Sequence, residues 1–129
     1  MNIKNVTEQK LALDLCKTRS TCRRARMAAV LSDKQGIFAW GWNHMLSTTK
    51  TAGSGMHAEH HAIRRANRNR LRGATLTVAG ISSGNNKNPL LSKPCEHCLA
   101  LAMKYGIKRI VYLTKDGTWA ALILTYQEV

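Results

Sequence analysis

Two short motifs, far apart in the chain, constrain its fold more than any other feature. The first is His57-Ala58-Glu59 and the second is Pro94-Cys95-Glu96-His97-Cys98. Each stands at the start of a helical pattern, because alanines recur four apart after His57 and Pro94 suits the first turn of a helix. One imidazole and two thiolates supply three of the four ligands of a tetrahedral zinc ion. The sequence therefore predicts a fold that brings two helix N-termini to one point.

Other zinc sites fit these motifs less well. In the peptidase motif H-E-x-x-H the base directly follows the first histidine, whereas this chain has Ala58 there and Glu59 one residue later. A structural site with two cysteines and two histidines, using His57 or His61, remains an alternative, but it leaves Glu59 without a role. The other histidines of the two motifs are predicted not to bind the metal: His60, His61 and His97.

Together the motifs match H-x-E…P-C-x-x-C, the pattern of zinc-dependent nucleobase deaminases. His57, Cys95 and Cys98 are then the ligands of one catalytic zinc ion, which keeps its fourth position for water and lowers the pKa of that water toward about 7. The helix N-termini help to hold the thiolates and hydroxide as anions. Glu59 is predicted to take the proton of this water, to give it to the ring nitrogen and to protonate the departing amine.

On these motifs the chain resembles the cytidine deaminase-like superfamily, from about Met27 to Tyr126. The resemblance implies an α/β fold of three layers with a five-stranded mixed sheet. It also implies hydrolysis of an amidine C–N bond, with zinc-bound hydroxide attacking C4 of cytosine. Within the site it implies that the Ala58 backbone N–H meets the base and that Asn43 contacts the substrate. Two neighbours of Asn43 are further candidates: Trp42 for stacking on the base, and His44 for the base or a phosphate.

Hydrophobic patterning predicts the element order α-β-β-α-β-α-β-β in one domain spanning residues 1–129. Three helices are expected at 8–17, 57–70 and 95–105, and five strands at 27–32, 37–42, 74–82, 107–114 and 119–126. Thr7 is expected to cap the first helix, Gly73 to close the second and Gly106 to end the third. The segment 20–26 is expected to be irregular and the stretch 47–55 flexible.

The last two strands are separated only by Lys115-Asp116-Gly117-Thr118. A parallel connection needs a crossover of about a dozen residues or more, so these strands are predicted to form an antiparallel hairpin. Deaminases of adenosine in transfer RNA run this pair parallel, although GWNH before HAE looks like the strand end of that branch. The antiparallel pair instead resembles free cytidine deaminases and bacterial toxin-type DNA deaminases.

The charge of the chain separates these two groups. Twenty Lys and Arg residues oppose seven Asp and Glu residues, a formal net charge of +13, which favours a polyanionic partner. Free cytidine deaminases tend to carry a ribose-binding glutamate where this chain has Met45. We therefore predict conversion of cytosine to uracil in DNA, single- or double-stranded, with RNA left open. The alternatives are a free cytidine or deoxycytidine deaminase, a tRNA adenosine deaminase-like enzyme, and a non-enzymatic basic zinc module, against which Glu59 argues.

The cations expected to meet phosphates flank the predicted pocket: Arg23, Arg24, Arg26, Lys87 and Lys93. Phe38, Trp40 and Trp42 alternate along one strand face and are expected mainly in the core, while His61 is expected on an outer, basic face with Arg64 and Arg65. Without an apolar run long enough for a bilayer or a secretory signal, a cytoplasmic monomer with no membrane contact is expected. If the domain derives from a toxin, an acidic immunity protein is an expected partner.

Overall fold

A five-stranded sheet with the strand order β2-β1-β5-β6-β7 forms the centre of the computed structural model, which describes residues 5–22, 24–45, 55–83 and 87–125. Its strands are β1 (Ala25–Asp33), β2 (Gly36–Trp42), β5 (Thr75–Ser82), β6 (Arg109–Leu113) and β7 (Trp119–Ile123). A separate two-stranded pair consists of β3 (His44–Met45) and β4 (Gly55–Met56). The helices are α1 (Val6–Thr18), α2 (Ala58–Arg65), α3 (Glu96–Lys104) and a short 3₁₀ helix, η1 (Arg68–Arg70).

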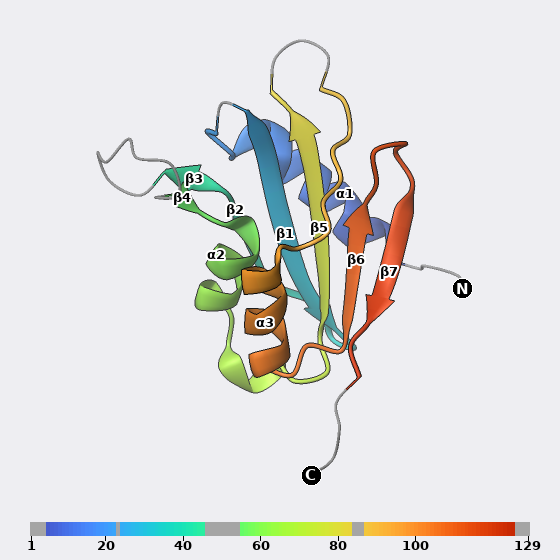
Figure 1. Cartoon of the computed structure of the whole chain (residues 1–129). Coiled ribbons are helices and arrows are strands. Elements are labelled where there is room, and N and C mark those ends of the chain that lie inside the picture. The colour runs from blue at the N-terminus through green and yellow to red at the C-terminus, as the bar shows by residue number, and fades with distance from the viewer. Residues whose placement is uncertain (1–4, 23, 46–54, 84–86, 126–129) are drawn as a thin grey trace.

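The sheet separates two helical layers, with α1 behind it and α2 and α3 in front of it (Figure 1). Because successive side chains of a strand point to opposite faces, β1 packs against the helices on both faces of the sheet. Ala28 and Val30 pack in the cluster under α1, whereas Ala29 and Leu31 pack in the cluster under α2 and α3. The predicted three-layer α/β architecture is confirmed.

The strand directions make the sheet mixed, as expected. β1 is antiparallel to β2 and β5, β5 is parallel to β6, and β6 is antiparallel to β7. The chain passes through α3 between the two parallel strands, as a parallel connection requires. In the tight turn between β6 and β7, Gly117 has a φ of 84° and the Thr118 hydroxyl donates to Asp116 Oδ1 at 2.8 Å. The last two strands therefore form the expected antiparallel hairpin.

The second helix is shorter than predicted. α2 ends at Arg65, and Ala66 is extended, with φ −80° and ψ 151°. Beyond it the Asn67 side chain accepts a hydrogen bond from the Asn69 backbone N–H, a local bond that competes with continued helix. Gly73, with a φ of 82°, accordingly closes the turn after η1 and not α2 itself.

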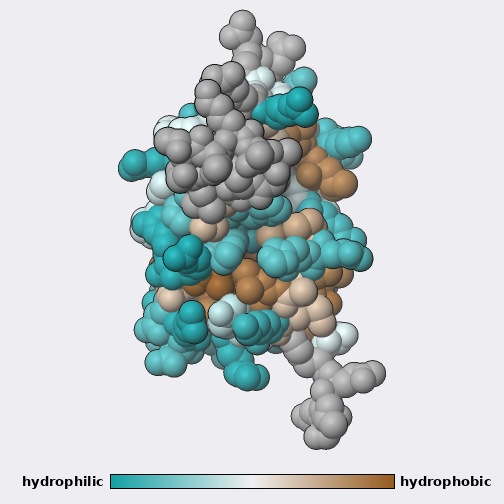
Figure 2. Space-filling model, turned by 60° about the vertical axis from the view of Figure 1, so that its left-hand side comes forward, coloured by the Kyte–Doolittle hydropathy of each residue, from teal (hydrophilic) through white to brown (hydrophobic). Residues whose placement is uncertain are grey.

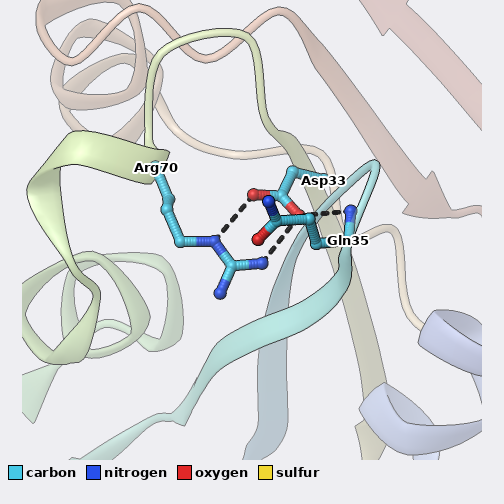
Figure 3. Close-up of polar contacts among 3 residues, drawn as sticks. All are labelled: Asp33, Gln35 and Arg70. Atoms are coloured by element: carbon cyan, nitrogen blue, oxygen red, sulfur yellow. Dashed lines mark hydrogen bonds and ion pairs between the residues drawn. The ribbon is translucent and has the colours of Figure 1, made fainter.

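A bidentate salt bridge anchors this turn to the sheet (Figure 3). Arg70 Nε donates to Asp33 Oδ2 at 2.8 Å and Nη2 donates to Asp33 Oδ1 at 2.7 Å, while the guanidinium lies 4.5 Å from the centroid of the Phe38 ring. Asp33 also accepts from the Gln35 backbone N–H at 2.9 Å within the β1–β2 turn. The segment that follows α2 is thus fixed to the β1–β2 hairpin.

The N-terminal expectations need two corrections. Thr7 lies in the first turn of α1, and Asn5 is the N-cap residue, without a side-chain capping bond. The Asn5 amide instead donates to Thr77 Oγ1 at 2.8 Å, a buried bond that ties α1 to β5. The segment 20–26 is not irregular throughout, because β1 already begins at Ala25 and pairs with Ser82.

At the other elements the boundaries shift by little. Gly106, with a φ of 79°, ends α3 as predicted, and β7 ends at Ile123. The stretch 47–55 falls almost wholly outside the described residues; its last residue, Gly55, begins β4. Within the described ranges, no helix combines the length and the apolar composition needed to cross a membrane.

Candidate metal centre and active site

The two motifs meet at neighbouring helix N-termini. His57 is the N-cap residue of α2 and Cys95 that of α3, with Cys98 in the following turn. His57 Nδ1 lies 3.3 Å from Cys98 Sγ and 3.8 Å from Cys95 Sγ, and the three atoms are all within 4.8 Å of one another. Zinc bonds of about 2.3 Å to sulfur and 2.0 Å to nitrogen at tetrahedral angles separate such atoms by about 3.6 Å. The three ligand atoms therefore fit one zinc ion.

The chemistry of the donors also favours a cation. Cys98 is fully buried, and its burial, together with the negative charge of Glu59 and the neighbouring Cys95, raises the pKa of its thiol. A thiol in that setting becomes a thiolate only beside a strong positive charge, which a metal ion supplies. One nitrogen and two sulfur ligands suit zinc. We conclude that His57, Cys95 and Cys98 are placed to hold it.

Glu59 lies beside these ligands with only 6% of its surface exposed. Burial raises the pKa of its carboxyl group, and His57 and a hydrogen bond with Cys98 oppose that rise in part. A raised carboxyl pKa moves proton uptake and release toward neutral pH, as general acid–base catalysis requires. The environment of Glu59 is therefore compatible with general acid–base catalysis.

A cavity of about 230 Å³ opens next to these groups. It is smaller than the roughly 300–1,000 Å³ of pockets that enclose a drug-sized ligand, so it suits a fragment of about the size of one base. Seven residues line it: Met27, Asn43, His57, Ala58, Glu59, Lys93 and Cys95. A larger hollow of about 450 Å³ lies at the opposite end of the sheet, beside Ser32, Thr75 and Lys108, and none of the predicted catalytic residues lines it.

Asn43 lines the cavity with most of its amide already engaged. Its Nδ2 donates to the Ala25 carbonyl at 2.8 Å, and its Oδ1 accepts from the Met27 backbone N–H at 2.9 Å and from the Ser20 hydroxyl. An amide nitrogen carries two N–H donors, so one remains for another partner. Asn43 thus both fastens the start of β1 and leaves a single donor for a ligand.

Trp42 and His44 do not line the cavity. Trp42 packs against the cluster under α1, and its backbone N–H donates to His61 Nδ1 at 3.2 Å. His44 Nδ1 bonds to the Trp42 carbonyl at 3.0 Å, and its ring meets that of His61 edge-on at 4.6 Å. His61 is half-buried at the outer edge of β2, near the positive charges of Arg65 and Arg64, and its ring also binds the β2 backbone there.

A bulge explains why the three aromatic residues of β2 do not share one face. Leu31 pairs with Ala39 but Ser32 pairs with Ile37, so Phe38 is an extra residue in β2. Phe38 therefore packs in the cluster under α2 and α3, and Trp42 packs in the cluster under α1.

The predicted phosphate contacts separate into several groups. Lys93 lines the cavity. Arg26 points to the α1 side, where its Nη1 donates to the Lys17 carbonyl at 3.2 Å near the end of α1. Arg24 and Lys87 are exposed but outside the cavity lining, and Arg23 falls outside the described residues.

Two residues that position the site were missed in the sequence. Met27 forms a wall of the cavity, and Gly41 lets α2 pack directly on the β2 backbone. A glycine between two tryptophans in a strand is the available signal for such a close backbone approach. Nothing in the sequence singles out Met27, because any apolar residue fits the pattern of that strand.

The chain matches the model of the family described as "Cytidine and deoxycytidylate deaminase zinc-binding region" over residues 4–114. It is similar in structure to the cytidine deaminase of Burkholderia pseudomallei, at 19% identity and a TM-score of 0.69, over 94% of this chain and 93% of that chain. The cytidine deaminase of Mycobacterium leprae is 19% identical, with a TM-score of 0.58, over 93% and 94% of the two chains.

A dCMP deaminase from the cyanophage S-TIM5 is 18% identical, with a TM-score of 0.61, over 84% of this chain and 81% of that chain. No curated protein sequence shows a significant match to the chain. The structural similarities at these identities show the shared fold, and the family match covers most of the chain, including both zinc-binding motifs. The chain therefore belongs to the cytidine and deoxycytidylate deaminase family with a zinc-binding region.

Proposed function

We propose that this chain is a zinc-dependent hydrolytic deaminase that converts cytosine to uracil in DNA. The choice of substrate rests on the large excess of positive side chains, few of which are paired with a carboxylate in the described structure. The net charge is +13, and Arg70 and Asp33 form the one salt bridge among the described residues. A polyanion supplies the missing negative charge, whereas a free nucleoside does not.

The chemistry consumes water and cytosine and yields uracil and ammonia. Zinc held by His57, Cys95 and Cys98 supplies Lewis acidity that makes a water molecule nucleophilic near neutral pH. The Glu59 carboxylate accepts the proton of that water and delivers it to the ring nitrogen N3. The same carboxyl group then carries a second proton to the departing amine.

Two groups of the chain can orient the base. Ala58 lines the cavity as the first residue of α2, where backbone N–H groups have no partner within the helix, so its N–H suits the carbonyl of the base. Asn43, which also lines the cavity, offers its remaining amide N–H. Lys93 adds a positive charge to the cavity wall for a phosphate of the same strand.

The openness of the metal site supports a polymeric substrate. His57 and Cys95 are both exposed, although they are expected to bind the metal and they line the cavity. A site open to solvent lets the chain on both sides of an extruded base continue past it, as deamination within a polynucleotide requires. Free cytidine deaminases tend to carry a ribose-binding glutamate where this chain has Met45, and its absence also favours a polymeric substrate.

The main alternative is a deaminase of free cytidine or dCMP. It is favoured by the names of the similar solved structures, which are a dCMP deaminase and cytidine deaminases. The antiparallel β6–β7 hairpin fits either substrate and argues against a transfer RNA adenosine deaminase. The net positive charge of the chain and the exposure of the metal ligands His57 and Cys95 lead us to prefer DNA.

A deamination assay tests the proposal. Zinc-loaded protein is incubated with single-stranded DNA, duplex DNA and RNA, which are sequenced for C-to-T changes, and with cytidine and dCMP, which are followed chromatographically. Glu59→Gln protein serves as the matched control for contaminating activity. We expect Glu59-dependent changes in DNA; activity confined to cytidine or dCMP would overturn the choice of substrate.

A further inference from the structure

An arginine–tryptophan cluster covers the outer edge of β2. Arg65 of α2 places its guanidinium carbon 5.7 Å from the Trp40 ring centroid and 5.3 Å from that of Trp42. Arg19, just after α1, lies 5.8 Å from the Trp42 ring on the same strand. Because β2 is the last strand at this side of the sheet, the cluster occupies a true edge. We call these four residues the edge cluster: Arg19, Trp40, Trp42 and Arg65.

Side chains already occupy the backbone groups of this edge. Arg65 Nη1 donates to the Trp40 carbonyl at 3.2 Å, the Trp42 N–H donates to His61 Nδ1, and His44 Nδ1 bonds to the Trp42 carbonyl. A further strand needs those same groups to pair with the sheet. A strand added at Trp40 and Trp42 would have to displace these side chains, so we expect a partner to bind through the side chains of the edge cluster.

The side chains of the edge cluster suit a strand of nucleic acid. In the part of the chain that the structure describes, the single salt bridge joins Arg70 to Asp33, so neither Arg19 nor Arg65 has a carboxylate partner. Trp40 remains 39% exposed. A guanidinium stacked on an aromatic ring keeps N–H donors for a phosphate, and exposed tryptophan rings stack on bases regardless of sequence.

The edge cluster adjoins residues of the catalytic cavity along the chain. Asn43 directly follows Trp42 and lines the cavity, and β3 begins at the next residue and pairs with Met56, which precedes the ligand His57. Figure 2 brings this side of the molecule forward and shows, on its coloured part, hydrophilic residues above and below a band of hydrophobic ones. A strand that enters the cavity with one base can therefore continue along this edge.

We infer that the edge cluster binds the single-stranded segment of DNA that flanks the base in the cavity. The inference rests on the proposed action on DNA. Arg19 and Arg65 contact phosphates of this segment, and Trp40 stacks on one of its bases. The cluster would then contribute to binding of the polymer but not to the reaction of a free nucleotide.

The test compares two double variants with the same loss of charge. Arg19→Gln/Arg65→Gln removes the cations of the edge cluster, and Lys34→Gln/Lys108→Gln removes two exposed cations at the opposite end of the sheet. Binding of fluorescein-labelled single-stranded DNA is measured by anisotropy from low to moderate salt. The binding series uses zinc-loaded protein that also carries Glu59→Gln, so that the DNA is not consumed.

We expect the edge variant to raise the Kd about tenfold or more over the distal variant. Loss of two phosphate contacts lowers the slope of log K against log salt by about 1.4, at about 0.7 for each contact with a single strand. With an intact Glu59, kcat/KM for free dCMP or cytidine should be equal in the two double variants. Equal Kd values and equal salt slopes would overturn the inference even when the wild-type protein deaminates DNA.

A second measurement keeps both arginines, so its result does not depend on correct folding of the Arg19→Gln/Arg65→Gln variant. Trp42→Phe/Trp119→Phe protein retains Trp40 as its tryptophan, and stacking of a base on that ring quenches its fluorescence in a saturable way. An unquenched signal at saturating DNA contradicts the stacking role. If wild-type protein neither binds nor deaminates DNA while it deaminates dCMP, the proposed function itself has failed.

Discussion

Gly41→Ala offers a sharp structural test, because α2 crosses β2 at this glycine in direct backbone contact. A Cβ at residue 41 would lie 2.4 Å from the Ala62 nitrogen, 2.8 Å from the Ala58 carbonyl oxygen and 2.9 Å from the His61 carbonyl carbon. Ordinary contacts of a Cβ begin near 3.4 Å. The obstructing atoms belong to a helix backbone, so α2 as a whole must retreat by about 1 Å, a displacement that close-packed interiors resist.

That displacement sets the expected magnitudes. Overpacking of a core typically costs about 1–3 kcal/mol of the free energy of unfolding, and backbone contact places Gly41→Ala toward the upper end. α2 carries His57 at its N-cap and Glu59 in its first turn, so both move with the helix. A misplacement of about 1 Å can lower catalytic efficiency by about 10²-fold. We therefore expect losses of stability, zinc affinity and kcat/KM together.

Gly80→Ala is the matched comparison. A Cβ there would meet flexible side-chain ends, Met27 Sδ at 2.4 Å and Ser92 Oγ at 2.9 Å, which can rotate away. It should cost less stability by urea unfolding and leave zinc affinity unchanged, while it alters KM because Met27 lines the cavity. Wild-type stability, zinc affinity and kcat/KM in Gly41→Ala would refute the argument that this glycine positions α2.

Three further results are expected. The hydrogen bond from Arg70 lowers the pKa of Asp33. The bridge therefore stabilises the fold above the ordinary aspartate pKa of 3.8 and loses this effect as pH falls through the lowered value. The difference in Tm between wild type and Asp33→Asn should be largest near neutral pH and should vanish in acid. Exposed Cys95 should be alkylated by iodoacetamide only in protein without zinc. Burial raises the pKa of Cys16 to about 12, so Cys16 should stay unreactive with or without zinc. Mass spectrometry measures the alkylation of both cysteines. Glu59→Gln should retain one zinc ion per chain by metal analysis and lose about 10²–10⁴-fold in kcat, and loss of the metal would contradict a role limited to proton transfer.

The features that could be predicted from the sequence are those fixed over short stretches. The spacing of His57, Cys95 and Cys98 at two helix starts determines which side chains can share a metal ion, and the structure brings these three together. The four-residue connection before Trp119 permits only a hairpin, which the structure contains. Such predictions succeed because covalent geometry and connection length decide them locally.

The missed features depend on contacts between distant segments. The segment after α2 is fixed by a bridge from Arg70 to Asp33, and helical periodicity carries no information about that partner. The bulge at Phe38 reverses the alternation in β2 and separates its aromatic residues between two cores. Periodicity assumes an unbroken strand, so it put Phe38 and Trp42 on one face, whereas they pack in different clusters.

A competition experiment shows whether the enzyme prefers DNA to a free nucleotide. Zinc-loaded protein is given single-stranded DNA and dCMP together, at equal concentrations of cytosine and at low salt, and uracil in each pool is measured over time. The ratio of initial rates equals the ratio of the two kcat/KM values. We predict that uracil forms predominantly in the DNA and that added salt suppresses this reaction more than deamination of dCMP. Preferential deamination of dCMP at every salt concentration would contradict the proposed action on DNA.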